Sequence, residues 1–291
     1  MCEFCIQHGE GKKWYLQMKN YSDELLHAEL TADQKQIIGA PTRAEAVVRM
    51  FENVILPAIT GVSKPKDESA QSRPRPQLSQ DEIVARRQIS HFGQVLPIED
   101  VEQTIDLADS ITRMPCGCRF ESTGKTDKRY CFGFGVDRWG VLGKYPDAAS
   151  SLETLGKEEV KKIFRTYGQE GLIHSIWTYG TPCVWGLCNC DHDCMAYKGY
   201  IEKGGPASFF RSEYICQVNW DLCTGCKLCM SQCQFGAQFY SSALGKVYID
   251  PTRCFGCGVC RAACQHDAIA ALPRQSHPDA ADVWLKNTNK T

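Results

Sequence analysis

The sequence predicts an α+β protein with a mostly helical, cysteine-rich N-terminal part and a small C-terminal domain made of two copies of one unit. A run of four cysteines, spaced C-x2-C-x2-C-x3-C, occurs twice near the C-terminus at an offset of 31 residues. Apolar residues recur at helical spacing in several segments before these runs. The 291 residues are enough for two domains, of which the repeated unit fills only about the last quarter.

Amphipathic helices are expected at four places in the N-terminal part. Residues 21–30 read as a short helix with acidic residues in its first turn. A second helix begins at a capping box formed by Thr42 and Glu45, and it ends near Pro57 or Gly61. The segments 99–111 and 152–167 also place their apolar residues on one side. We expect the apolar stripes of the first two helices to form core and to carry no chemistry.

Shifts in composition divide the chain into five parts. Residues 63–80 are rich in Lys, Arg and Pro and almost devoid of apolar side chains, which is typical of a linker. The division is residues 1–62, a helical N-terminal arm; 63–80, the linker; 81–212, a cysteine-rich domain; 213–273, the repeat domain; and 274–291, a tail.

Composition and charge exclude several classes of function. The net charge of −1 predicts no general attraction to nucleic acid. No apolar run approaches the roughly 20 residues of a membrane span. The N-terminus lacks the basic and apolar regions of a secretory signal. Eighteen cysteines in such a chain indicate the reducing cytoplasm and metal or cluster binding, rather than disulfides.

The two cysteine runs identify a known kind of domain. The first is Cys223, Cys226, Cys229 and Cys233; the second is Cys254, Cys257, Cys260 and Cys264. They resemble the bacterial two-cluster ferredoxin, in which the fourth cysteine of each run ligates the other cluster. The resemblance implies one [4Fe-4S] cluster on Cys223, Cys226, Cys229 and Cys264, and another on Cys254, Cys257, Cys260 and Cys233. Zinc is the weaker alternative, because zinc sites do not need four cysteines in one run.

The ferredoxin run usually ends in Cys-Pro, whereas Gln234 and Gln265 follow the last cysteines here. Each glutamine adds a backbone N–H and a polar side chain, which predicts less negative reduction potentials than those of an ordinary ferredoxin.

A second set of motifs precedes the repeat. It consists of four motifs in this order: Cys-x-Cys-Arg ending at Arg119, the single Cys131, Gly-Leu-Ile-His ending at His174, and Leu-Cys-Asn-Cys ending at Cys190. With the tandem run, this order resembles a little-characterised family of iron–sulfur proteins from anaerobes over about residues 94–272.

Counting the cysteines sets how many further clusters the chain can hold. Eight ferredoxin ligands out of eighteen cysteines leave ten. We expect at least one additional [4Fe-4S] cluster with ligands drawn from Cys116, Cys118, Cys131, Cys188, Cys190 and Cys194. A second additional site could use Cys2, Cys5, Cys183 or Cys216. In each C-x-C pair, the two cysteines are expected to serve different sites, since both can ligate one cluster only with strain.

Other polar side chains near these cysteines are candidates for supporting roles. His8, which completes a C-x2-C-x2-H pattern with Cys2 and Cys5, and His192 are candidate metal ligands. A capping arm with two free thiols is the alternative reading of the N-terminal pattern. His174 and Asp193 are candidates for ligation or proton handling. Arg119 is expected to offset cluster charge or to donate a hydrogen bond to a sulfur.

The sequence predicts a multi-cluster iron–sulfur protein or subunit that relays single electrons to or from a redox enzyme partner. No dinucleotide fingerprint, P-loop or nucleophile elbow is present. One alternative is a redox enzyme whose substrate binds an open iron of a cluster in the 116–194 region. The other is a metal-trafficking or zinc-stabilised scaffold.

Overall fold

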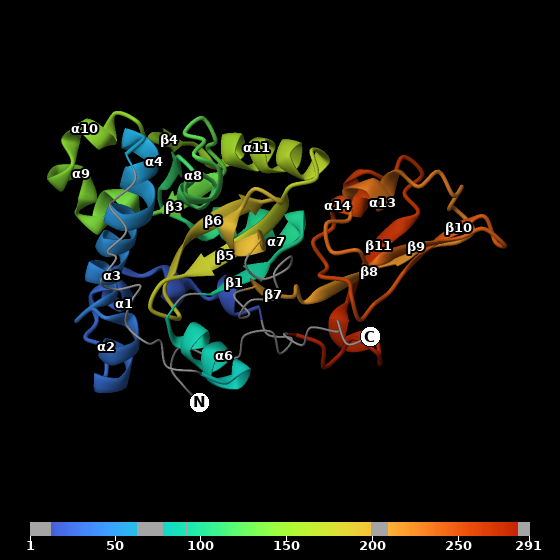
Figure 1. Cartoon of the computed structure of the whole chain (residues 1–291), viewed down its shortest axis with the longest axis horizontal. Helices are drawn as coiled ribbons and strands as arrows, with labels where there is room; N and C mark the ends of the chain where they lie inside the picture. The colour runs from blue at the N-terminus through green and yellow to red at the C-terminus, as the bar shows by residue number, and fades with distance from the viewer. Residues whose placement is uncertain (1–12, 63–77, 91, 199–208, 285–291) are drawn as a thin grey trace.

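The computed structural model describes residues 13–62, 78–90, 92–198 and 209–284. A seven-stranded sheet forms the centre of the N-terminal part, with the order β4-β2-β3-β6-β5-β1-β7 (Figure 1). Only the β1–β7 pair is parallel. The strands are β1 (Gly93–Val95), β2 (Ile111–Met114), β3 (Cys131–Phe134), β4 (Glu153–Leu155), β5 (Ile173–Thr178), β6 (Val184–Cys190) and β7 (Phe209–Phe210).

The sequence analysis predicted helices in this part and missed the sheet. Every residue of β5 and of β6 is buried, so these strands do not alternate between apolar and polar residues. Both strands mix apolar residues with buried polar ones, such as His174, Ser175 and Asn189, so their sequences show no period of two that would indicate a strand.

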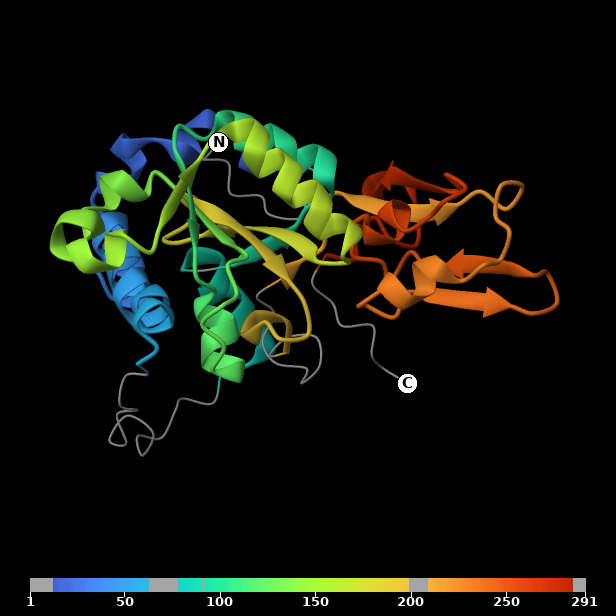
Figure 2. The ribbon, with the colours of Figure 1, turned by 90° about the horizontal axis from the view of Figure 1, so that it is seen from above.

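Helices cover both faces of this sheet. One face is covered by α7 (Ile98–Leu107) and α11 (Lys157–Gln169), which lie side by side in Figure 2. Their buried residues Val101, Ile105, Val160 and Phe164 pack into one core with the sheet. A helical rod covers the other face; it consists of α3 (Arg43–Met50), the π-helical segment η3 (Phe51–Ile55) and α4 (Leu56–Thr60). The short helix α8 (Gly117–Thr123) packs beside this rod.

Helix boundaries follow capping residues and glycines. Thr42 accepts a hydrogen bond from the backbone N–H of Glu45, and Gly61 ends α4 in the left-handed conformation. The helix predicted over 99–111 ends at Leu107, because residue 111 begins β2. The helix predicted from 152 begins only at Lys157, because 153–155 form β4. The remaining N-terminal elements are η1 (Trp14–Leu16), η2 (Met18–Tyr21), α1 (Asp23–His27), α2 (Ala32–Ile38), α6 (Gln80–Ile89), η4 (Val136–Trp139), α9 (Val141–Lys144), α10 (Pro146–Ala149) and α12 (Met195–Tyr197).

The C-terminal part contains two interlocked copies of a strand–helix–strand unit. The first copy is β8 (Tyr214–Val218), α13 (Leu228–Gln232) and β9 (Gln238–Ser241); the second is β10 (Lys246–Ile249), α14 (Val259–Ala262) and β11 (Ile269–Pro273). β8 pairs with β11, and β9 pairs with β10, so each two-stranded sheet takes one strand from each copy. Neither copy can therefore form its sheet alone.

The predicted tail begins with a docked residue. Arg274, in η6 (Arg274–Ser276), is fully buried and donates to the carbonyl oxygens of Ser212 (2.7 Å), Tyr214 (2.9 Å) and Cys254 (2.8 Å). The first residues after 273 thus help to hold the repeat domain. Among the helices in the described ranges, none is both long enough and apolar enough to cross a membrane.

Hydrogen bonds and ion pairs join the repeat domain to the N-terminal part. The side-chain amide of Gln234 donates to the carbonyl oxygen of Gly171 at 2.5 Å. Arg261 of α14 pairs with Glu99 of α7 at 2.6 Å. A Cβ atom on Gly171 would lie 1.9 Å from the side-chain oxygen of Gln232, so the two parts are in close contact at this glycine.

Candidate cofactor sites

The eight cysteines of the repeat fall into two groups of four, and each group combines both copies. Each group lines its own pocket in the repeat domain, and we call these the first pocket and the second pocket. The first pocket contains Cys223, Cys226, Cys229 and Cys264; the second contains Cys254, Cys257, Cys260 and Cys233. This is the crossed grouping that the resemblance implied, and it follows from the interlocked strands.

Backbone N–H groups point at sulfur atoms in both pockets. The N–H of Ala268 donates to Cys264 Sγ, and that of Ala237 donates to Cys233 Sγ, both at 3.4 Å. The N–H of Gly256 donates to Cys254 Sγ at 3.4 Å. Such donors stabilise the negative charge of thiolate ligands and of the group they bind. The donor set therefore fits an iron–sulfur cluster in each pocket.

Glycine is required in the loop that precedes each helix of the repeat. Gly225 and Gly256 are equivalent in the two copies, and both have φ near +71°. A Cβ atom on Gly225 would lie 2.1 Å from the carbonyl oxygen of Gly245, and one on Gly256 would lie 2.0 Å from that of Tyr214. No side chain fits at either position without a shift of the backbone.

A fifth cysteine lies beside the second pocket. Cys216 on β8 is buried, its backbone N–H donates to Cys254 Sγ at 3.3 Å, and its thiol is hydrogen-bonded to Cys254 and Cys260. Its equivalent in the other copy is Val247, which lines the first pocket. The two pockets thus differ in their number of thiols.

The six other candidate cysteines line one large cavity of about 590 Å³. We call it the six-cysteine cavity; its cysteines are Cys116, Cys118, Cys131, Cys188, Cys190 and Cys194. Strands β3 and β6 supply three of them, the start of α8 supplies two, and Cys194 precedes α12. The volume lies within the range of small-molecule and cofactor pockets.

The six thiols form two groups of three. Cys131 Sγ lies 3.4 Å from Cys116 Sγ and 3.7 Å from Cys188 Sγ. Cys194 Sγ lies 3.7 Å from Cys190 Sγ and is also hydrogen-bonded to Cys118. Each C-x-C pair thus contributes one cysteine to each group, and both groups line the same cavity. That the two cysteines of a pair serve different sites stays a prediction. Hydrogen bonds with Cys118 and Cys190 hold the pKa of Cys194 well below its usual value, which favours its thiolate.

A buried arginine supports one side of the cavity. Arg119 donates to Cys116 Sγ at 3.4 Å and to the carbonyl oxygen of Asn189 at 2.9 Å, and it pairs with Asp191 at 2.8 Å. Burial alone would lower the pKa of Arg119, but Cys116 and Asp191 raise it above its ordinary value. The guanidinium therefore remains a positive charge beside the thiols, as predicted from the sequence.

A hydroxyl group supports the other side. Ser175 Oγ lies 3.5 Å from Cys190 Sγ and accepts a hydrogen bond from the indole N–H of Trp177 at 2.9 Å. Both residues lie on β5, on the same face as the cysteines of β6. Because Oγ accepts from Trp177, its own proton can be donated to the sulfur.

The rest of the cavity lining is mostly apolar. It includes Ile37, Ile38, Met50, Val54, Ile55, Trp177, Tyr179 and Trp185, with Arg87 and Ser90 also lining the cavity. Val54 and Ile55 belong to the π-helical segment, a rare geometry that is frequent at functional sites. Within the described ranges, no three His, Cys, Asp or Glu side chains form a group suited to a single metal ion.

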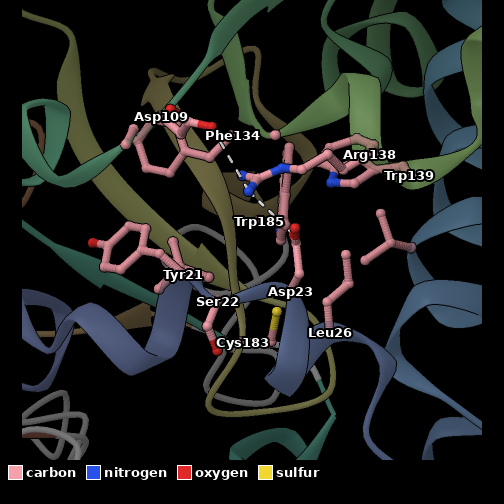
Figure 3. Close-up of a pocket in the computed structure, with 14 residues that line it drawn as sticks. Tyr21, Ser22, Asp23, Leu26, Asp109, Phe134, Arg138, Trp139, Cys183 and Trp185 are labelled. Carbon is pink, nitrogen blue, oxygen red and sulfur yellow. Dashed lines mark ion pairs between the residues drawn. The ribbon is translucent and has the colours of Figure 1, made fainter.

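Cys183 lies apart from all of these sites. It lines a small pocket with Tyr21, Asp23, Arg138 and Trp185 (Figure 3). Arg138 pairs there with Asp23 at 3.1 Å. The pocket holds about 20 Å³, room for roughly one water. Burial raises the pKa of the Cys183 thiol to about 12. Cys183 and Cys216 line different pockets, so they do not form a common site.

The predicted noncysteine ligands that lie in the described ranges, His174, His192 and Asp193, do not line the cavity. The side chain of His174 is hydrogen-bonded to Asn189 at 2.7 Å, and it packs against Phe164 on the α11 side of the sheet. His192 is exposed, and its ring contacts that of Tyr197. Asp193 pairs with Lys125 at 3.0 Å. Cys2, Cys5, His8 and the linker residues 63–77 lie outside the described residues.

The sequence analysis missed several residues that contact these sites. Ser175 and Trp177 were not identified. Successive side chains of a strand point to opposite faces of the sheet, so Ser175 and Trp177 share one face of β5, and His174 lies on the other. Tyr197, Phe235 and Phe255 were also missed. Only a comparison of the two repeat copies could have indicated the two phenylalanines, since Thr224 and His266 stand at the equivalent positions.

Residues 222–269 match the family described as "4Fe-4S dicluster domain". This match covers the repeat and identifies an iron–sulfur, ferredoxin-type domain in the C-terminal part. No curated protein matches the chain, and no solved structure does.

Proposed function

We propose that this protein relays single electrons between a redox partner protein and a further iron–sulfur group in the six-cysteine cavity. The observation that carries the proposal is that six cysteines from separate segments line one cavity in the same chain as a dicluster domain. Iron–sulfur clusters supply one-electron chemistry when bound.

The residues of the three sites have distinct roles in this proposal. The first and second pockets each provide four cysteine ligands for one [4Fe-4S] cluster, with backbone N–H groups directed at the sulfurs. The six-cysteine cavity provides the ligands of at least one more. Arg119 offsets part of the negative charge there, and Ser175 supports Cys190 by a hydrogen bond.

Electron transfer with an external protein is supported by the surface of the repeat domain. Cys226 of the first pocket is exposed. The nearby apolar side chains of Leu222, Leu228 and Leu244 are 50%, 44% and 57% exposed. An exposed apolar surface next to a redox group is suited to brief contact with a partner protein.

The cavity gives one observation in favour of an enzyme instead. Six thiols are two more than one four-cysteine cluster needs, and they form two groups of three. A cluster held by three cysteines leaves one iron without a protein ligand. The apolar wall would then enclose a small substrate beside that iron.

Anaerobic stopped-flow mixing tests the relay. The protein is reduced by a low-potential donor and mixed with a one-electron acceptor protein. We expect the visible iron–sulfur absorption to return rapidly as the protein is reoxidised. The number of electrons released per chain should exceed what two clusters can supply. Reoxidation that stops at two electrons would contradict a role for the six-cysteine cavity.

A further inference from the structure

The two pockets of the repeat domain lie differently with respect to the N-terminal part. We infer that the second pocket is the one that exchanges electrons with the six-cysteine cavity, and that Tyr197, Phe235 and Phe255 fill the space between them. This inference rests on the proposed function. It orders the sites as partner protein, first pocket, second pocket and six-cysteine cavity.

Tyr197 begins the connection on the cavity side. It ends the short helix α12, which starts directly after Cys194. The backbone N–H of Tyr197 is hydrogen-bonded to the sulfur of Cys194, a cysteine of the cavity. The Tyr197 side chain is 1% exposed, so protein atoms surround it. Its position is therefore fixed relative to the cavity.

Tyr197 also contacts the second pocket directly. Its hydroxyl group donates to the carbonyl oxygen of Gln234, the residue after Cys233. Its ring centre lies 5.9 Å from that of Phe235. A cysteine of the cavity and a cysteine of the second pocket are thus joined by one side chain and two hydrogen bonds.

Two stacked phenylalanines continue the connection across the second pocket. The rings of Phe235 and Phe255 are 3.9 Å apart and only 6° from parallel. Both line the second pocket, and Phe255 directly follows Cys254. Electron transfer between redox groups slows steeply with distance through poorly packed space. The packed rings therefore provide a favourable route between the two sites.

The first pocket lacks every part of this connection. At the equivalent positions of the other repeat copy, Thr224 and His266 line the first pocket, and both are exposed. Gln265, the equivalent of Gln234, is exposed as well, whereas Gln234 donates to the carbonyl oxygen of Gly171. The two pockets are thus used differently: the second lies against the N-terminal part, and the first faces solvent.

The proposed step moves one electron and forms no bond. A low-potential one-electron donor protein reduces the group at the first pocket and is itself oxidised. The electron then passes to the second pocket and on to the six-cysteine cavity. At each transfer the giving site is oxidised and the receiving site reduced by one electron, and no proton moves.

The repeat supplies a matched pair of variants for the test. Phe235→His with Phe255→Thr gives the second pocket the side chains of the first. Phe239→His with Tyr248→Thr changes two exposed aromatic side chains of β9 and β10 that line neither pocket, and it serves as the control. The full-length protein with its clusters is reduced by a light flash in the presence of a flavin donor. Freeze-quenching at successive times, followed by EPR, measures when the electron reaches the cavity.

We expect the first double variant to slow this arrival by about tenfold, equivalent to ~1.4 kcal/mol of activation free energy. The control variant should leave the rate unchanged. Iron content and the midpoint of thermal unfolding are measured on both variants. Equal arrival rates in the two variants, with all iron retained, would overturn the inference. Absence of iron from the cavity would instead overturn the proposed function.

A second measurement covers the case in which the double variant fails to fold. Power saturation of the EPR signal from the reduced cavity reports the nearest paramagnetic site. Cys226→Ser disrupts the first pocket at an exposed position. Fast relaxation of the cavity signal should persist in this variant, because the second pocket is intact. Loss of the fast relaxation would identify the first pocket as the neighbour and overturn the inference.

Discussion

Nη1 of Arg119 lies 3.4 Å from Sγ of Cys116 and donates a hydrogen bond to it. The same guanidinium pairs with Asp191, which is one-third exposed, and lies over the ring of Tyr130 at 4.4 Å. A nearly buried positive charge is thus fixed beside the cavity, where it stabilises negative charge more strongly than it would in water.

Replacing Arg119 should therefore change the redox behaviour of the cavity. In Arg119→Gln the reduced form loses an attractive charge, and we expect the reduction potential to fall by about 60 mV, which is ~1.4 kcal/mol for one electron. An EPR-monitored redox titration measures this shift. The control is Arg165→Gln, which removes an exposed pair with Glu102. A potential that is unchanged in both variants would contradict the role given to Arg119.

Gly117 is required for α8 to approach the helical rod. A Cβ atom there would lie 2.2 Å from the carbonyl oxygen of Val54. We expect Gly117→Ala to destabilise the fold by about 3 kcal/mol, the upper part of the range for overpacking. It should also reduce iron loading, since Gly117 lies between Cys116 and Cys118. Gly143→Ala, where a Cβ would meet nothing within 4 Å, is the control for thermal unfolding and iron content. Equal stability of the two variants would refute this contact.

His174 should make the stability of the fold depend on pH. Burial lowers the pKa of His174 from 6.5 to about 4, so the folded protein keeps the ring neutral. Between these values the unfolded chain binds the extra proton more readily. With respect to this group, the free energy of unfolding is highest above pH 6.5, and it falls by about 3 kcal/mol as the pH falls toward 4.

Thermal unfolding of the wild type and of His174→Gln across this pH range measures the effect. The difference between the two proteins should shrink or reverse as the pH falls. Parallel curves for His174→Gln and the wild type would show that His174 is not buried in its neutral form.

Single cysteine substitutions separate the cavity from the rest of the chain. We expect Cys131→Ser to lose about four iron atoms, the content of one [4Fe-4S] cluster, because Cys131 contacts both Cys116 and Cys188. Cys183→Ser should retain all iron, because Cys183 lies in a different pocket. Iron and sulfide analysis of the two purified proteins gives the comparison. If Cys183→Ser lost iron and Cys131→Ser did not, Cys183 rather than Cys131 would be a cluster ligand.

The sequence predicted the cysteines of the sites better than it predicted the fold around them. Thiol ligands occur at fixed spacings within single loops, so the runs at Cys223 and Cys254 could be read directly. The sheet could not, since β5 and β6 are buried along their whole length and show no alternation. The gathering of Cys131, Cys188 and Cys194 into one cavity depends on the pairing of β3 with β6, which is a long-range contact.

The asymmetry of the repeat was also beyond the sequence analysis. Gln234 and Gln265 were treated alike, as polar groups beside two clusters. The structure separates them, because the side chain of Gln234 binds Gly171 of the N-terminal part, while Gln265 is exposed. Which pocket lies against the N-terminal part depends on long-range contacts made by both copies, such as those of Gln234 and Arg261, and local sequence carries no such information. The less negative reduction potentials expected from these glutamines stay a prediction.

The number of clusters per chain decides whether the six-cysteine cavity holds a cluster. Anaerobic iron and sulfide analysis of the full-length protein, combined with EPR of the reduced state, counts them. The account predicts at least about twelve iron and twelve sulfide per chain, from two clusters in the repeat domain and one or more in the six-cysteine cavity. A content of about eight of each, with EPR signals from only two [4Fe-4S] clusters, would contradict it.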